Sequence, residues 1–164
     1  MLAPYKEHCR YLKSVEVEGP GTGVLQGRDG TSCLVLSRGH FQIPEPCYID
    51  TTGHLNAVEV NICYNQLLYV SLGQSIASGL VPALDVFSLE HYRARRLPDV
   101  LIYNIEVAFR QVIDPQDFHG EFSITRAVVT KRSVKLETHL NFWDQHGGAA
   151  HGNISIAILR TESA

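Results

Sequence analysis

The last third of the chain alternates apolar and polar residues over four separate segments. The apolar side chains fall on odd positions from Tyr103 to Phe109 and on even positions in the three segments that follow. A repeat of two is typical of a strand with one buried face, and turn-forming residues separate the four segments. The pattern therefore predicts four antiparallel strands, whose inward-facing residues are Tyr103, Ile105, Val107, Phe109, Phe122, Ile124, Val128, Val134, Leu136, Leu140, Phe142, Ile154, Ile156 and Ile158.

The middle of the chain has the spacing of a helix instead. Asn56 is a favoured N-cap residue, and Glu59 stands three positions later, where its carboxylate completes a capping box. Apolar residues then recur on nearly every side of the predicted helix, which is typical of a buried helix. We expect this helix to run to about Ala77, because a glycine and a proline follow soon after. A second, shorter helix is expected from Ser88 to Arg96.

Two further strands are expected before the long helix, from Tyr11 to Glu18 and from Cys33 to Phe41, with turns at 19–23 and 28–30. The second strand ends at Ile-Pro-Glu-Pro, where the two prolines remove backbone donors. The simplest package for these elements is an antiparallel sheet wrapped round a long central helix. The sequence thus predicts an α+β fold, a single hotdog domain over residues 1–164.

Composition excludes several classes of function. The chain has 164 residues, of which 45% are hydrophobic and 19% charged, and its formal net charge is −3 without a basic tract. We therefore expect no nucleic-acid partner. The longest apolar stretch, 61–84, is interrupted by polar residues, so no membrane span is expected. The four cysteines form no C-x-x-C pair, and we expect reduced thiols in a cytoplasmic protein. His146 and His151 flank a glycine-rich turn without a third ligand, so no metal is expected.

The segment that leads into the long helix concentrates candidate chemistry. Backbone N–H groups in the first turn of a helix can polarise a carbonyl oxygen, and Gly53 allows the tight turn and the close approach of a ligand. His54 has an intrinsic pKa suited to proton transfer near neutral pH. Tyr48 and Glu59 stand nearby in the sequence, and Asn65 places an amide within the helix.

Each of these residues also has a structural interpretation. Asn56 and Glu59 can serve as a capping box alone, and Asn65 can be a core amide with a hydrogen-bond partner. His54 can be an exposed loop residue without a chemical role. Their concentration in one short segment favours a site over three unrelated structural roles.

Three stretches of the chain resemble a known family. YIDTTGHLNAVEVNICYNQLLY closely resembles the helix-entry motif of the FcoT-type thioesterases, hotdog enzymes that act on acyl thioesters, and FWDQHGGAAHGNISIAIL and PYKEHCRYL resemble two further stretches of that family. The resemblance implies a homodimer or higher homo-oligomer with an acyl tunnel, no cofactor, and a thioester bound near the helix N-terminus. Carried over by position, it implies site residues at Tyr5, Tyr48, Asn56 and Asn65.

One branch of the family adds glycine to the β-carbon of an α,β-unsaturated acyl thioester held on an acyl carrier protein. This sequence places Arg38 and His40 on the strand before Tyr48, and an arginine in an acyl tunnel would hold an anion such as the glycine carboxylate. Alternatively, Arg38 points to solvent or pairs with Glu45. We expect Arg38, Gly53 and Ala57 to contact the substrate. The acyl group of that substrate would be carried on an acyl carrier protein or on CoA.

The sequence therefore favours an acyl-thioester enzyme with two related reactions. In hydrolysis, the helix N-terminus would hold the oxyanion while His54 or Glu59 activates a water placed by Asn65. In glycine addition, the same N–H groups would stabilise an enolate while His54 or Glu59 deprotonates glycine. A plain fatty acyl-CoA thioesterase and a non-catalytic acyl-binding hotdog are the alternatives.

Overall fold

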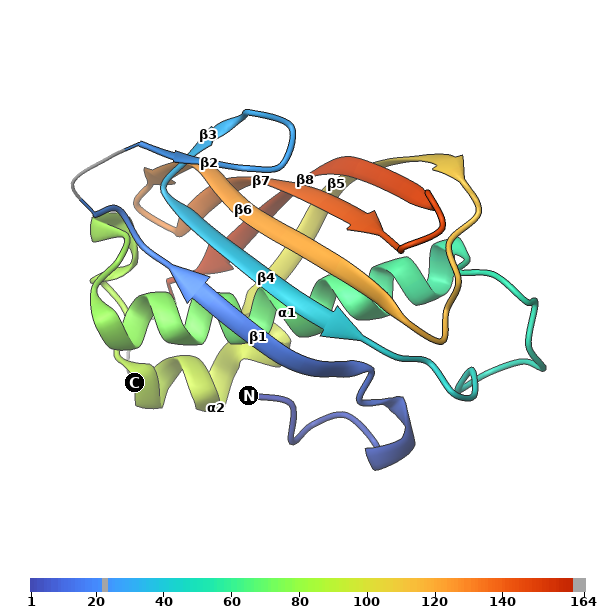
Figure 1. Cartoon of the computed structure of the whole chain (residues 1–164). Coiled ribbons are helices and arrows are strands. Elements are labelled where there is room, and N and C mark those ends of the chain that lie inside the picture. Colours follow the sequence, from blue (N-terminus) through green and yellow to red (C-terminus); the bar gives the residue numbers. More distant parts are fainter. Residues whose placement is uncertain (22–23, 161–164) are drawn as a thin grey trace.

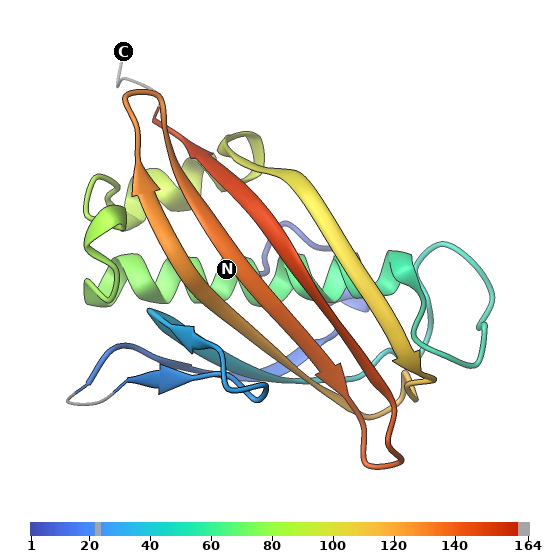
Figure 2. The same ribbon diagram turned by 90° about the horizontal axis from the view of Figure 1, so that it is seen from above.

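In the computed structural model, which describes residues 1–21 and 24–160, a six-stranded antiparallel sheet curves over one long helix, α1 (Ala57–Ser78) (Figure 1). The strand order is β1-β4-β6-β7-β8-β5, and every neighbouring pair is antiparallel. Seen from above, the strands cross the helix obliquely (Figure 2). This arrangement confirms the predicted α+β hotdog fold. The sheet strands are β1 (Leu12–Glu18), β4 (Val35–Phe41), β5 (Val100–Gln111), β6 (Phe118–Val129), β7 (Ser133–Trp143) and β8 (Ala149–Leu159).

A small hairpin lies between β1 and β4 and was not predicted. It consists of β2 (Leu25–Gln26) and β3 (Ser32–Cys33), joined by the expected turn at 28–30. The predicted strand from Cys33 to Phe41 is thus divided at Leu34 between β3 and β4. Of the turn predicted at 19–23, residues 22 and 23 lie outside the described residues.

The ends of α1 follow the predicted signals closely. Asn56 is the N-cap and forms the capping box with Glu59, and Gly79 ends the helix in the left-handed conformation with φ of 61°. The second helix, α2 (Leu89–Asp99), begins after Ser88 as predicted but ends later, because Pro98 is accommodated in its last turn. Two single 3-10 turns, η1 (Glu7–Cys9) and η2 (Pro82–Leu84), complete the helical elements of the described chain. No helix in these residues is long and apolar enough to cross a membrane.

The core lies between the concave face of the sheet and α1. The predicted inward residues of β7 and β8, and the first two of β6, are buried. Val128 is an exception, with 40% of its surface exposed. The register of β6 shifts between Ile124 and Arg126, and a bulge of this kind moves the following side chains to the opposite face. The prediction that Val128 faces inward was therefore wrong.

Strand β5 is the second exception, and it lies at the edge of the sheet. The alternating residues expected to be buried are largely open, with Tyr103 52%, Ile105 46% and Phe109 47% exposed. Ile105, Val107 and Phe109 share one apolar face, as predicted, and a hollow separates this face from the first turns of α1, which β5 crosses (Figure 2). Tyr103 lies on the other face, where its hydroxyl reaches Glu137, because the register of β5 shifts between Ile102 and Asn104. The prediction that Tyr103 faces inward was therefore wrong.

The N-terminal segment covers one half of the face of α1 that points away from the sheet. Met1 packs against Gly73, the rings of Tyr5 and Tyr69 are 6.4 Å apart, and the Cys9 carbonyl accepts a hydrogen bond from Gln66. The first half of this face remains open, and Val58 there is 49% exposed. The expectation of a buried helix therefore fails for the first half of α1. In the second half most residues are buried or half-buried, but Gln74, Ala77 and Ser78 are exposed.

Candidate active site

Tyr48 and Asn56 are brought together at the start of α1, as the sequence suggested. The loop of residues 42–56 leaves β4 and returns to the helix, and the Tyr48 hydroxyl donates a hydrogen bond of 2.8 Å to Oδ1 of Asn56. The same oxygen accepts the N–H groups of Val58 and Glu59, at 3.0 and 3.2 Å. Asn56 therefore joins the loop to the helix as well as capping the helix.

The capping box changes which backbone groups are available for chemistry. Two first-turn N–H groups are bound to Asn56, and the N–H of Asn56 itself donates to Oε2 of Glu59 at 3.1 Å. Within residues 1–21 and 24–160, the N–H of Ala57 and Nδ2 of Asn56 have no hydrogen-bond acceptor. Of the free N–H groups expected at the helix start, only the backbone N–H of Ala57 and the side-chain amide of Asn56 are therefore available as donors in the described residues.

His54 is exposed and its ring is oriented by the loop. Gly53 has φ of 73° and provides the turn, while Nδ1 of His54 lies 3.0 Å from the carbonyl oxygen of Thr52. A carbonyl oxygen can only accept, so this contact places the hydrogen on Nδ1. Nε2 then carries a lone pair, which is the form in which histidine can accept a proton.

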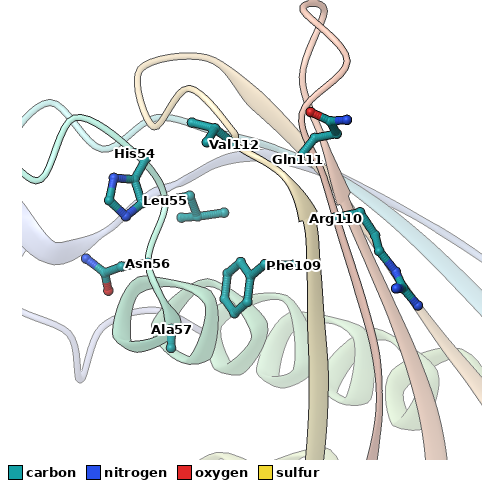
Figure 3. Close-up of a pocket in the computed structure, with 8 residues that line it drawn as sticks. All are labelled: His54, Leu55, Asn56, Ala57, Phe109, Arg110, Gln111 and Val112. Carbon is teal, nitrogen blue, oxygen red and sulfur yellow. The ribbon is translucent and has the colours of Figure 1, made fainter.

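A pocket of about 360 Å³ opens beside these residues. Residues 54–57 form one wall and residues 109–112 at the end of β5 form the other (Figure 3). Phe109 points toward the helix start, whereas the Arg110 side chain is directed away from His54 (Figure 3). The sequence did not identify the second wall, because strand alternation shows which face a residue occupies but not which loop that strand end meets.

A second hollow of about 200 Å³ continues from this pocket and is apolar. It shares Ala57 and Phe109 with the first pocket and extends past Val60 to Ile105 and Val107. A polar opening at the helix start thus adjoins an apolar groove between α1 and β5.

The structure does not bring Arg38 to this pocket. Ser37 is buried, and a side chain at Gly39 would contact Leu67 of α1. Arg38, between them in β4, therefore lies on the opposite face of the sheet, where its guanidinium binds Glu18 at 2.9 Å and Glu121 at 3.2 Å. The expectation of Arg38 in an acyl tunnel was therefore wrong for this chain. The alternative expectation, that Arg38 forms an ion pair away from the pocket, was correct, but its partners are Glu18 and Glu121 rather than Glu45.

Three other expected site residues, Glu59, Asn65 and Tyr5, are not among the residues that line the pocket. Glu59 is 1% exposed and engaged in the cap. Asn65 lies on the open face of α1, half-buried, and donates to Asn61 at 3.3 Å, so it is not a core amide. Tyr5 packs against Tyr69, and burial raises the pKa of its phenol. Asn65 starts roughly 13 Å along the helix from Asn56, which places it outside hydrogen-bond reach of the helix start.

The turn between β7 and β8, which carries His146, is held by hydrogen bonds to Asp144. Asp144 accepts the N–H groups of His146, Gly148 and Asp114 at 2.8, 2.7 and 2.7 Å and so fixes the turn between β7 and β8. His151 belongs to β8. Across the described residues, no group of three histidine, cysteine or acidic side chains is arranged to hold a metal ion. Cys9 and Cys63 are buried free thiols, and Cys33 and Cys47 are half-buried free thiols.

A curved antiparallel sheet around one long helix defines a hotdog fold. Two solved structures share this fold at low sequence identity. A Staphylococcus aureus protein, SAV2348, determined in complex with CoA, is 10% identical with a TM-score of 0.52, covering 77% of this chain and 75% of the other. The protein YhdA of Lactococcus lactis is 8% identical with a TM-score of 0.50, covering 92% of this chain and 95% of the other.

The family follows from sequence. The FcoT-like thioesterase domain matches residues 1–158, and the chain belongs to this family. A (2E)-enoyl-[ACP] glycyltransferase of Streptomyces coeruleorubidus is 38% identical over 97% of this chain and 93% of its own length. Relatives with the same name from Mycobacterium marinum and Mycobacterium tuberculosis H37Rv are 32% identical, over 97% of this chain and 83% of theirs.

Proposed function

We propose that this protein adds glycine to the β-carbon of a (2E)-enoyl thioester carried on an acyl carrier protein. The relatives that share 32–38% identity over nearly the whole chain bear the name of that reaction. The observation in the structure that carries the proposal is the helix start, where the donors of Ala57 and Asn56 and the acceptor of His54 border one pocket. One buried core joins the sheet to both helices, and we take the chain to be one domain.

The first task is to polarise the thioester carbonyl. When an amine attacks the β-carbon, the π electrons move toward the carbonyl and an enolate oxygen develops. The N–H of Ala57 and Nδ2 of Asn56 are the donors we assign to that oxygen, assisted by the positive end of α1. The oxygen of Asn56 is held by three donors, which keeps its Nδ2 turned outward for this role.

The second task is proton transfer, and we assign it to His54. Glycine enters as an ammonium, and Nε2 of His54 takes its proton, so that the free amine attacks the β-carbon. The imidazolium then returns the proton to the α-carbon of the enolate, and no by-product forms. Glu59 is the weaker candidate, because its carboxylate is buried and already accepts the N–H of Asn56.

Glycine also brings a carboxylate that needs a partner. Arg110 is the one arginine or lysine among the residues that line the pocket, and it forms no ion pair within the described chain. Its exposed side chain can turn by rotation about its χ angles. We therefore assign the carboxylate to Arg110 in place of Arg38, which is engaged by Glu18 and Glu121 on the other face.

The acyl chain has an apolar path away from these groups. The hollow between α1 and β5 begins at Ala57 and is lined by Val60, Ile105, Val107 and Phe109. Apolar burial favours placing the chain there, with the thioester at the polar end of the pocket.

We further propose that the active form is a homodimer paired along β5. The strand lies at the sheet edge with exposed apolar residues, and an unpaired edge with an apolar face favours pairing with another strand. A second copy at this edge would cover the apolar groove, which is open in one chain.

The second candidate function is plain acyl-thioester hydrolysis, which membership in the FcoT-like thioesterase family favours. Water would replace glycine at the same polarised carbonyl. The two are separated by mass spectrometry of the purified protein with an enoyl and a saturated thioester on the same carrier, each with and without glycine. Addition predicts a glycine adduct of the enoyl substrate alone. Hydrolysis of both substrates without any adduct would refute the glycine-addition proposal.

A further inference from the structure

The loop that carries Tyr48 is hydrogen-bonded to the N-terminal segment, and that segment is in turn held by Gln66 of α1. This side chain is completely buried. Its Oε1 accepts the N–H groups of Tyr11 and Leu12, each at 2.9 Å, and its Nε2 donates to the carbonyl of Cys9 at 2.6 Å. One helix residue therefore fixes the backbone of residues 9–12 through three hydrogen bonds.

Tyr11 extends this anchor to the loop. Its carbonyl accepts the N–H of Gln42 at 3.0 Å, and its buried hydroxyl reaches the carbonyl of Glu45 at 3.4 Å. Burial, and after it the neighbouring Cys47 thiol, raises the pKa of the Tyr11 phenol, so the hydroxyl keeps its proton and can donate.

The following part of the loop has few other attachments. In the described chain, the side-chain hydrogen bonds of residues 48–54 either stay within that segment or join Tyr48 to Asn56. Before Tyr48, the loop is held by Tyr11 at Gln42 and Glu45, and by the segment 115–116 at Ile43. After Tyr48, Leu55 donates its N–H to the carbonyl of Ile113, and Asn56 binds Tyr48. The anchor at Glu45 lies three residues before Tyr48, and Tyr11 connects it to α1 through Gln66.

We propose that Tyr11 is a positioning residue for the Tyr48–Asn56 pair, acting through the loop at Glu45. A phenylalanine would fill nearly the same core volume and keep the backbone hydrogen bond to Gln42, but it would release the loop at Glu45. The role rests on the proposed function, because it concerns the residues assigned to hold the enolate.

The test compares Tyr11→Phe with Tyr92→Phe. Tyr92 is also buried and also donates its hydroxyl to a main-chain carbonyl, that of Tyr69 at 3.0 Å, remote from the loop. We expect similar small drops in melting temperature for both variants. Only Tyr11→Phe should lower kcat for the glycine adduct, roughly two- to tenfold, the range of one ordinary hydrogen bond.

Two readouts separate positioning from general destabilisation. In a Tyr48→Phe background, adding Tyr11→Phe should lower kcat no further, because the group that it positions is gone. Hydrogen exchange should rise over residues 46–53 in Tyr11→Phe and stay at the wild-type level in Tyr92→Phe. Equal losses of kcat in the two single variants, additive losses with Tyr48→Phe, or unchanged exchange would overturn the role of Tyr11. Absence of an adduct from wild-type protein would instead refute the proposed function, and the exchange measurement would still decide the role of Tyr11.

Discussion

Oδ1 of Asn56 lies 2.8 Å from the hydroxyl of Tyr48 and also caps the first turn of α1. The structural role and the proposed chemical role therefore meet in one side chain, whose Oδ1 accepts three hydrogen bonds while its Nδ2 has no acceptor among residues 1–21 and 24–160. Substitutions that separate the oxygen from the nitrogen can distinguish these roles.

Asn56→Asp should preserve the fold and remove activity. An aspartate keeps the oxygen that accepts the N–H groups of Val58 and Glu59, and negative charge is favourable at a helix start. It lacks the Nδ2 donor, and loss of one such donor lowers turnover roughly 100- to 1000-fold. Asn56→Ala should in addition lose about 0.5 to 2 kcal/mol of stability with the cap. Adduct formation and thermal melting measure both effects, and wild-type turnover in Asn56→Asp would show that Nδ2 has no part in the reaction.

Arg110→Ala should raise KM for glycine about ten- to a hundredfold, because a charge-assisted hydrogen bond contributes roughly 1.5 to 3 kcal/mol. Hydrolysis of a saturated thioester should change little, since no glycine is bound. Arg38→Ala is the matched control. It should leave KM for glycine unchanged but lower the melting temperature, because Glu121, only 3% exposed, loses a cationic partner. A raised KM in Arg38→Ala alone would return the carboxylate site to that residue.

Ile105→Lys should weaken the proposed dimer, because it places a charge on the apolar face of edge strand β5. Val129→Lys is the control, since Val129 is 45% exposed against 46% for Ile105 and lies in β6 rather than at the β5 edge. Light scattering at micromolar concentration should show a shift toward monomer for Ile105→Lys only. Equal masses for the wild type and both variants would count against pairing along β5.

Asp144→Asn should make the melting temperature less dependent on pH in the acid range. Burial alone would raise the pKa of this carboxyl, but three backbone N–H donors, from Asp114, Gly148 and His146, outweigh it and lower the pKa. A folded pKa below the unfolded value of about 3.9 adds stability above that pH, and this contribution is lost as pH falls further. The wild-type advantage in melting temperature should be present at pH 7 and shrink below about pH 4. If the wild type melts higher than Asp144→Asn by the same amount at every pH, the difference comes from packing and not from the charge of Asp144.

The sequence was sufficient for the elements that depend on local signals. The capping box of Asn56 and Glu59 and the left-handed Gly79 fixed the ends of α1 almost to the residue, because these signals act within one helical turn. Strand alternation likewise identified the buried faces of β7 and β8. It failed at Val128 and at Tyr103, where register shifts that follow from pairing with β7 and β8 change the face of the strand.

The sequence predicted only one of the two walls of the candidate site. Tyr48, Gly53, His54 and Asn56 belong to one segment, so a local motif could indicate them together. The opposite wall at 109–112 and the position of Arg38 depend on which strand lies beside which and on which face each side chain takes. The order β1-β4-β6-β7-β8-β5 brings the end of β5 to the helix start and leaves β5 as the open edge. Contacts between residues distant in the chain are set by packing of the whole sheet, so only the tertiary structure could decide them.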